Sequence, residues 1–263
     1  MRPKPPRLLI IAGSDSGGGA GIQADIKTAG LFGVYAMTAV TAVTVQDTQR
    51  VHSIELLPPK IVCEQIRVCL NDIGADAIKI GMLGSANVVN AVADALKKHA
   101  RGIPIVLDPI LISSSGKRLL SRDAIESFKS KLLPFATLVT PNLPEARALA
   151  GMRGTDRNAA ETAGRKLIAT GARAALIKGG HATRATVDDV LVWSGGVEIY
   201  GFPRLRTKHT HGTGCVLSTA IACGLSQGLS LPLATGRARE FVQHAIETAP
   251  GLGHGHGPLN LLR

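Results

Sequence analysis

The chain has 263 residues, of which 45% are hydrophobic and 19% charged, a composition typical of globular proteins. Large α/β units run as single domains at this length, and we expect one domain over residues 1–263. The apolar runs fall far short of the roughly 20 residues that a membrane span needs, which argues against a membrane protein. The four cysteines form no C-x-x-C pair, so we expect no zinc site, no disulfide framework, and a cytoplasmic protein with reduced thiols.

The formal charge of +11 raises the possibility of a nucleic-acid-binding protein. The basic residues are scattered, however, and one Trp, two Tyr and five Phe are too few to suggest a platform for stacked bases. A basic surface of this kind also steers small phosphorylated ligands towards a site. We therefore expect neither a nucleic-acid partner nor a membrane partner.

Strand-like and helix-like segments alternate along the chain. Short apolar runs that end in a turn-forming or polar group predict strands at 7–13, 38–45, 76–81, 103–109, 137–141 and 174–180. Helical patterns lie at 59–73, 86–100, 121–133 and 156–170, and two more, at about 214–227 and 231–248, close the chain. Residues 187–208 resemble an antiparallel insertion with a turn at 194–196.

Apolar strands with helices between them predict a parallel sheet covered on both faces. Such sheets bind ligands beyond the carboxyl ends of their strands, so candidate site residues are sought directly after each strand.

The first strand runs into "GSDSGGGAGIQAD", with five glycines between positions 13 and 21. Such a loop lets backbone N–H groups approach a ligand closely, although no Gly-Lys-Ser/Thr follows to make a Walker A motif. The second strand ends in Gln46 and Asp47. A glutamine amide can hold a ring nitrogen and an exocyclic amine together, whereas a polar pair at a strand end is more often a loop cap.

Three further strand ends carry charged or amide groups. Asn142 and Glu145 have the spacing of a helix capping box, which is the favoured interpretation, although Glu145 and Asp108 are also the kind of carboxylates that hold hydrated magnesium. Lys178 stands where it can contact a nucleotide phosphate, or else is a surface lysine before a glycine turn.

Gly212, Gly214 and Cys215 present backbone N–H groups where a small-residue helix begins. Such a helix start binds anions through its unpaired N–H groups and the helix dipole. Cysteine is often a small buried hydrophobe, but at a helix N-terminus we expect the pKa of the Cys215 thiol to fall from about 8.5 towards neutrality.

In their order along the chain, "GSDSGGGAGIQAD", "TAVTVQDT", "KIGMLG", "VLDP", "TPNLPEA", "KGGH" and "HGTGC" resemble the hydroxymethylpyrimidine and phosphomethylpyrimidine kinases of thiamine biosynthesis, in the ribokinase-like superfamily. The resemblance covers nearly the whole chain. It implies an α/β/α sandwich around a mostly parallel sheet, ATP and Mg²⁺ as cofactors, and a homodimer. Two positions depart from the family pattern. Ser16 replaces a proline, which would make the loop less rigid, and His209 replaces a common asparagine.

The resemblance also implies a role for each candidate residue. Gln46 would bind the pyrimidine, with Gly13, Val45, Met82 and Asp25 around it. Asp108 and Glu145 would hold magnesium, and Asn142, Thr213 and Lys178 would contact the nucleotide. Gly212, Gly214, Cys215 and Lys178 would be catalytic, with Cys215 as general base. The expected reaction is ATP-dependent phosphorylation of 4-amino-5-hydroxymethyl-2-methylpyrimidine and then of its monophosphate. A pyridoxine or pyridoxal kinase of the same fold is the alternative, and a non-enzymatic nucleic-acid-binding protein is a distant third.

Overall fold

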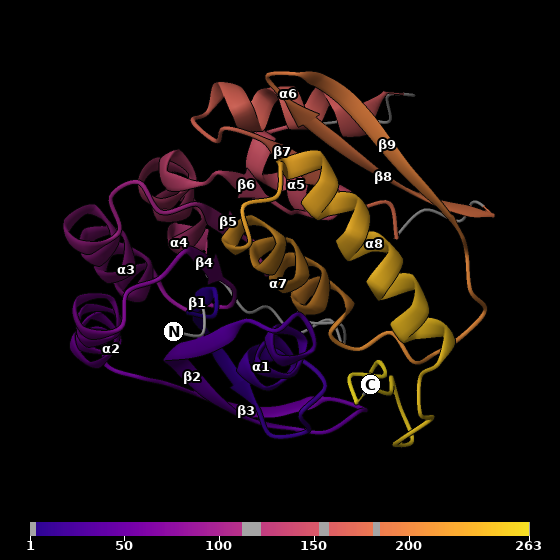
Figure 1. The fold of residues 1–263 in the computed structure, drawn as a ribbon, viewed down its shortest axis with the longest axis horizontal. Coiled ribbons are helices and arrows are strands. Elements are labelled where there is room, and N and C mark those ends of the chain that lie inside the picture. The colour runs from indigo at the N-terminus through magenta and orange to yellow at the C-terminus, as the bar shows by residue number, and fades with distance from the viewer. Residues whose placement is uncertain (1–3, 112–121, 153–157, 181–184, 263) are drawn as a thin grey trace.

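The computed structural model describes residues 4–111, 122–152, 158–180 and 185–262 (Figure 1). Within these residues, nine strands form one sheet in the order β3-β2-β1-β4-β5-β6-β7-β8-β9. Neighbours from β2 to β7 pair in parallel, whereas β3, β8 and β9 are antiparallel to their neighbours. The strands are β1 (Arg7–Asp15), β2 (Tyr35–Gln46), β3 (Val51–Leu56), β4 (Ala77–Ile80), β5 (Ile105–Leu107), β6 (Leu138–Val139), β7 (Ala175–Ile177), β8 (Thr186–Trp193) and β9 (Gly196–Pro203).

Helices cover both faces of this sheet. Leu8 and Ile10 of β1 pack with α1 (Gly21–Leu31), α7 (Thr213–Ser226) and α8 (Leu231–Glu247) in one apolar core. Leu9 and Ile11 pack into a second core on the opposite face. That face carries α2 (Pro59–Asp72), α3 (Ala86–His99), α4 (Arg122–Ser127), α5 (Leu143–Ala150) and α6 (Ala159–Ala169). Because alternate side chains serve two cores, the central strands are continuously apolar, and the predicted three-layer α/β/α sandwich is confirmed.

Most predicted elements are present with shifted ends. The antiparallel pair expected at 187–208 is formed by β8 and β9, which extend the edge of the main sheet beyond β7. Strand β3 was not predicted because it lies at the opposite edge with most of its residues at least partly exposed. The helix expected at 121–133 continues from α4 into a π-helical turn at Phe128–Leu132 and a 3-10 turn at Leu133–Phe135. Positions 121, 156 and 157 of the predicted helices lie outside the described residues.

The carboxyl ends of the parallel strands meet at one edge of the sheet, where the N-terminus of α7 also arrives. Asp15 ends β1, Gln46 ends β2, and Asp108 and Lys178 directly follow β5 and β7. No helix in the described part of the chain is both long enough and apolar enough to cross a membrane.

Candidate active site

A cavity of about 490 Å³ opens at the carboxyl edge of the sheet. It extends from the ends of β1 and β2, past the start of α7, to β8, the end of β9 and α8. Eleven of the residues selected from the sequence line it: Gly13, Gln46, Met82, Asp108, Asn142, Glu145, Lys178, Gly212, Thr213, Gly214 and Cys215. The structure thus brings together side chains that are up to about 200 positions apart in the chain.

Two predicted substrate residues do not line this cavity. Val45 alternates with Thr44 and Gln46 along β2, so its side chain points away from the cavity and is 57% exposed. Asp25 is fully buried in α1, where its carboxylate accepts hydrogen bonds from Lys79 Nζ and Thr219 Oγ1, each at 2.7 Å. We therefore correct both assignments: Val45 is a surface residue and Asp25 is a partner of Lys79.

Lys79 is a functional-site residue that the sequence analysis missed. It is the one charged residue of the buried strand β4, its side chain has no exposed area, and it borders the cavity. Burial lowers the pKa of its ammonium, but the charges of Asp25 and other nearby acidic groups outweigh this effect and raise the pKa overall. Lys79 therefore places a permanent positive charge beneath the cavity. A lysine within an otherwise apolar strand is the sequence signal that could have identified it.

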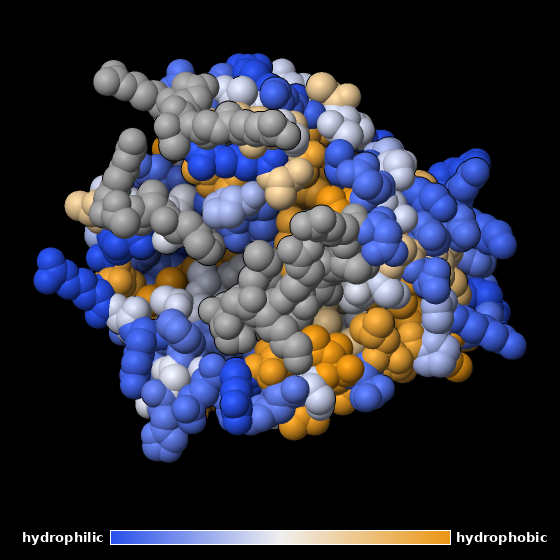
Figure 2. Space-filling view, turned by 180° about the vertical axis from the view of Figure 1, so that it is seen from behind, coloured by the Kyte–Doolittle hydropathy of each residue, from blue (hydrophilic) through white to orange (hydrophobic). Residues whose placement is uncertain are grey.

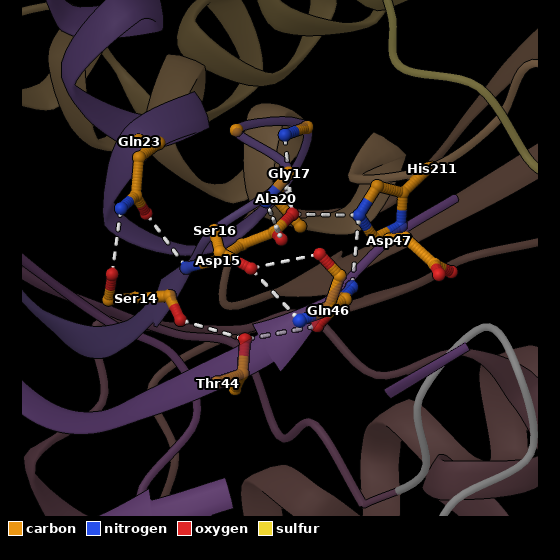
Figure 3. A network of polar contacts seen from close by, with 12 residues as sticks. Ser14, Asp15, Ser16, Gly17, Ala20, Gln23, Thr44, Gln46, Asp47 and His211 are labelled. Atoms are coloured by element: carbon orange, nitrogen blue, oxygen red, sulfur yellow. Dashed lines mark hydrogen bonds and ion pairs between the residues drawn. The ribbon is translucent and has the colours of Figure 1, made fainter. Parts of the chain in front are cut away.

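The glycine-rich loop after β1 is held by the carboxylate of Asp15 (Figure 3). Asp15 Oδ1 accepts a hydrogen bond from the backbone N–H of Gly17 at 2.8 Å. Its Oδ2 accepts from the N–H groups of Gly19 at 3.2 Å and Ala20 at 2.8 Å, and from His211 Nε2 at 2.9 Å. Asp15 thus joins this loop to the segment that precedes α7, which sequence spacing alone did not reveal.

Ser16, which replaces the family's proline, binds the end of β2. Its hydroxyl donates to the carbonyl oxygen of Gln46 and accepts from the backbone N–H of Gln46, both at 2.9 Å. The loop therefore gains a link to Gln46 from this hydroxyl. The other departure, His209, packs against Gly257 in the C-terminal segment and does not line the cavity.

The start of α7 forms a cradle of backbone N–H groups against the loop after β1. Gly212 adopts the left-handed conformation with φ of 82°, and a β-carbon there would overlap the carbonyl oxygen of Gly19. A β-carbon on Gly214 would lie 3.2 Å from Lys178 Nζ and 3.5 Å from Asp108 Oδ2. The glycines therefore let the helix start approach the charged groups closely, as an anion site requires.

The expected low pKa of Cys215 is wrong. The side chain is buried with 8% exposure, and burial raises the pKa of the thiol to about 11. The ammonium of Lys79 lowers the pKa, whereas the carboxylates of Asp25 and Asp108 raise it again. Burial together with the two carboxylates outweighs the effect of the Lys79 ammonium, so Cys215 holds its proton at neutral pH.

Two acidic side chains and one lysine meet beside α7. Lys178 Nζ lies 2.9 Å from Asp108 Oδ1, and Thr140 Oγ1 donates to the same oxygen at 3.1 Å. Glu145 and Asn142 form the predicted capping box of α5, with N–H···O distances of 2.9 and 2.8 Å. Glu145 also lines the cavity, where burial raises the pKa of its carboxyl to about 7, with Lys178 lowering and Asp108 raising it.

The far end of the cavity was not recognised in the sequence. Apolar side chains line it between β8, the end of β9 and α8: Val187, Pro203, Leu205 and Ile246. Arg239 of α8 borders this end, pairs with Asp189 at 2.8 Å and lies 4.7 Å from the ring centre of Phe202. Asp189 in turn accepts a hydrogen bond from Gly179 N at 2.7 Å, which links α8 to the turn after β7. The cavity therefore combines a polar centre with an apolar far end.

Comparisons with known proteins agree on one family. The phosphomethylpyrimidine kinase family model matches residues 15–260. A hydroxymethylpyrimidine/phosphomethylpyrimidine kinase of Streptomyces coelicolor is 46% identical over 257 residues, which cover 97% of this chain and 94% of that protein. The thiamine biosynthesis bifunctional protein ThiED of Geobacter sulfurreducens is 43% identical over 96% of this chain, and the chain spans about half (51%) of its length.

Solved structures of both phosphomethylpyrimidine and pyridoxal kinases share this fold. A phosphomethylpyrimidine kinase from Clostridium difficile superposes with a TM-score of 0.81 at 36% identity, covering 92% of this chain and 100% of that one. A pyridoxal kinase from Bacillus subtilis, in complex with ADP, gives a TM-score of 0.89 at 32% identity, covering 97% of both chains. With a family model that matches nearly its whole length, the chain belongs to the phosphomethylpyrimidine kinase family.

Proposed function

We propose that residues 1–263 form one ATP-dependent kinase domain. It phosphorylates the hydroxymethyl group of 4-amino-5-hydroxymethyl-2-methylpyrimidine and then phosphorylates the monophosphate to the diphosphate, in thiamine biosynthesis. One observation carries this proposal: the start of α7 opens into a single cavity that both Gln46 and the Lys178–Asp108 pair also line. A ring held at Gln46 would direct its side-chain alcohol towards a phosphate held at α7.

The proposed chemistry depends on positioning and charge stabilisation. The hydroxymethyl oxygen attacks the γ-phosphorus, and the bond to the bridging β,γ-oxygen breaks. The backbone N–H groups of Gly212, Gly214 and Cys215 and the ammonium of Lys178 stabilise the charge that builds on the transferred phosphoryl oxygens. Because Cys215 keeps its own proton, the proton of the alcohol passes late to an oxygen of the transferred group. Cys215 therefore contributes through its backbone rather than as a base.

Magnesium fits the two carboxyl groups of the site. Asp108 and Glu145 are both nearly buried and border the cavity, and Glu145 has a raised pKa that a cation would relieve. Mg²⁺ is held in proteins by one or two carboxylates plus phosphate oxygens and water. Asp108 and Glu145 would hold the ion, which when bound would neutralise charge on the β- and γ-phosphates, while Asn142 and Thr213 border the same space.

The alternative substrate is pyridoxal, because the chain is also similar to pyridoxal kinases. Gln46 favours the pyrimidine, since pyridoxal has no amine next to its ring nitrogen for the amide to pair with. The test is ADP release with the hydroxymethylpyrimidine, its monophosphate and pyridoxal offered in parallel. We expect the highest kcat/KM for the two pyrimidines. A kcat/KM for pyridoxal above both would replace the proposal with the alternative.

We further propose a cytoplasmic homodimer. All four cysteines are free thiols, in keeping with a reducing compartment. Figure 2 shows apolar side chains gathered in the lower part of the face opposite to that of Figure 1. Elements β2, β3 and α2 leave large apolar side chains exposed, among them Val43, Val45 and Leu56. Light scattering after gel filtration should give twice the monomer mass, and Val45→Lys should shift the protein towards monomer. A parent of monomer mass at micromolar concentration would contradict the dimer.

A further inference from the structure

The Gln46 side chain lies between two hydrogen-bonding neighbours that determine which way its amide points (Figure 3). One end of the amide, drawn as Nε2, is 3.1 Å from His211 Nε2. The other end, drawn as Oε1, is 3.4 Å from Thr44 Oγ1. The oxygen and nitrogen of an amide have nearly the same size, so packing does not distinguish them. Which atom is which is therefore assigned from the neighbouring donors and acceptors.

His211 Nε2 is a donor because of Asp15. The Asp15 carboxylate receives four hydrogen bonds, one of them from His211 at 2.9 Å, and offers only acceptors while it is ionised. Burial raises the pKa of Asp15, but the hydrogen bonds from His211, Gly17 and Ala20 outweigh this effect, and the pKa lies below its ordinary value. The proton of His211 therefore sits on Nε2, and an amide NH₂ cannot face it.

Thr44 leads to the same orientation independently. Its hydroxyl donates its single proton to the carbonyl oxygen of Ser14 at 2.9 Å, so towards Gln46 the hydroxyl oxygen is an acceptor. The end of the amide next to Thr44 is therefore the NH₂ group, and the end next to His211 is the oxygen. Both neighbours favour this direction, and the 3.1 Å contact with His211 constrains the amide more strongly than the 3.4 Å contact with Thr44.

The surroundings leave the amide few other degrees of freedom. Ser16 holds the backbone N–H and carbonyl of Gln46 through two hydrogen bonds of 2.9 Å. The imidazole of His211 fills the space above Gly19, where a β-carbon would lie 2.6 Å from Cδ2 of the ring. A half-turn of the amide about its own axis is then the main remaining motion, and it is the motion that His211 opposes.

We propose that His211, held by Asp15, is a specificity-determining residue that fixes the direction of the Gln46 amide and thereby selects 4-aminopyrimidines over 4-oxopyrimidines. The fixed amide presents its acceptor on the His211 side and its donor on the Thr44 side. A 4-aminopyrimidine matches this pattern, with its amine on the oxygen and its ring nitrogen on the NH₂ group. The 4-oxo compound reverses both groups, because its ring N–H donates and its carbonyl accepts. This inference rests on the proposed function.

The kinetic test compares kcat/KM for the 4-amino and 4-oxo forms of the hydroxymethylpyrimidine. Two mismatched hydrogen bonds, at roughly 1–3 kcal/mol each, predict a preference of the parent for the amino form of about 30-fold or more. In His211→Phe the ring remains but its donor is lost, so only the longer contact with Thr44 opposes a turn of the amide, and the preference should fall at least about tenfold. The fall should come from a gain in the relative rate of the oxo form.

His209→Phe is the matched control, because His209 is two residues away and lies outside the cavity. We expect it to keep the parent preference. If His211→Phe lowers kcat/KM for both compounds by the same factor and leaves the preference unchanged, His211 only supports the loop and the proposal is overturned.

A second measurement needs neither a variant nor a substrate. Nitrogen-15 NMR of histidine-labelled parent protein should show His211 with a proton on Nε2 at pH 7.5, and His211→Phe identifies the resonance. A bare Nε2 would overturn the proposal. Failure of the proposed function is distinguishable: the parent would then turn over neither pyrimidine, while the NMR result would still decide how His211 is protonated.

Discussion

The carbonyl oxygen of Gly19 occupies the place where a β-carbon on Gly212 would stand. The loop after β1 and the start of α7 are therefore in backbone contact, although almost 200 residues separate them in the chain. This contact brings the amide of Gln46, which Ser16 links to the loop, and the N–H groups of α7 into one cavity. A residue larger than glycine at 212 must push the two loops apart.

We therefore predict that Gly212→Ala lowers kcat by at least 100-fold, because a misplacement of about 1 Å in a positioned site has effects of that size. Gly228→Ala is the matched control. Gly228 has nearly the same φ, 81° against 82°, but has no atom near a β-carbon. It should cost only the roughly 1–2 kcal/mol of left-handed strain and leave kcat unchanged. Urea unfolding and steady-state kinetics measure both variants, and equal kcat values would contradict the contact.

Gln46→Leu should weaken binding of the pyrimidine and leave that of ATP nearly constant. The substitution leaves the ring nitrogen and the amine without partners, at a cost of roughly 1–3 kcal/mol per buried group. The KM for the pyrimidine should therefore rise by tenfold or more. Val45→Thr is the control, since Val45 faces outward on the same strand and should leave both KM values unchanged. An equal rise of both KM values in Gln46→Leu would reject the assignment.

Glu145→Gln separates the capping role of Glu145 from its proposed role at magnesium. Glutamine also completes a capping box, so the free energy of unfolding should change by less than about 1 kcal/mol. The charge is lost, however, so the magnesium concentration that gives half-maximal rate should rise about tenfold or more. A magnesium titration of parent and variant at saturating ATP checks this. Superimposable curves would mean that Glu145 only caps α5 and does not bind magnesium.

Asp25→Asn should destabilise the fold, because it leaves the buried ammonium of Lys79 without its charge partner. Removing one member of a buried pair costs about 3–5 kcal/mol. The double variant Asp25→Asn with Lys79→Met should recover part of this loss, since no unpaired charge remains. The free energy of unfolding from urea titration is the readout. A pair of variants whose effects simply add would show that the two side chains are not coupled.

The sequence reveals those parts of the fold and site that depend on local pattern. Apolar strands with glycine or polar ends predict the sheet, and glycines before a small-residue helix predict the cradle at Gly212. Local pattern does not reveal contacts between residues that are distant in the chain. The Asp15–His211 pair joins positions 196 apart, and Lys79 pairs with Asp25 only in the folded core. The assignment of Val45 to the substrate site was wrong because side chains alternate along β2, which places Val45 on the face opposite Gln46. The pKa expected for Cys215 was wrong because burial and two nearby carboxylates raise it by more than the Lys79 ammonium lowers it.

The last prediction concerns the reactivity of Cys215. Alkylation needs the thiolate, and a pKa of about 11 leaves only about one thiol in a thousand ionised at pH 8. The rate of iodoacetamide reaction at Cys215 should therefore rise about tenfold per pH unit from pH 8 and level off only near pH 11. Mass spectrometry of peptides after timed exposure gives the rate for each cysteine. A plateau already at pH 7 would mean a thiolate at neutral pH.

The same protonation state predicts the effect of Cys215→Ser. A serine hydroxyl is also neutral and keeps the backbone N–H in place, so kcat should fall by less than about tenfold. Loss of a general base would instead lower kcat by about 10²–10⁴-fold. Cys223→Ser is the control for loss of a buried thiol, because Cys223 lies in the same helix away from the cavity. A loss of 10²-fold or more in Cys215→Ser, but not in Cys223→Ser, would mean that Cys215 acts as the general base. The Cys215 thiol would then lose its proton only when both substrates are bound.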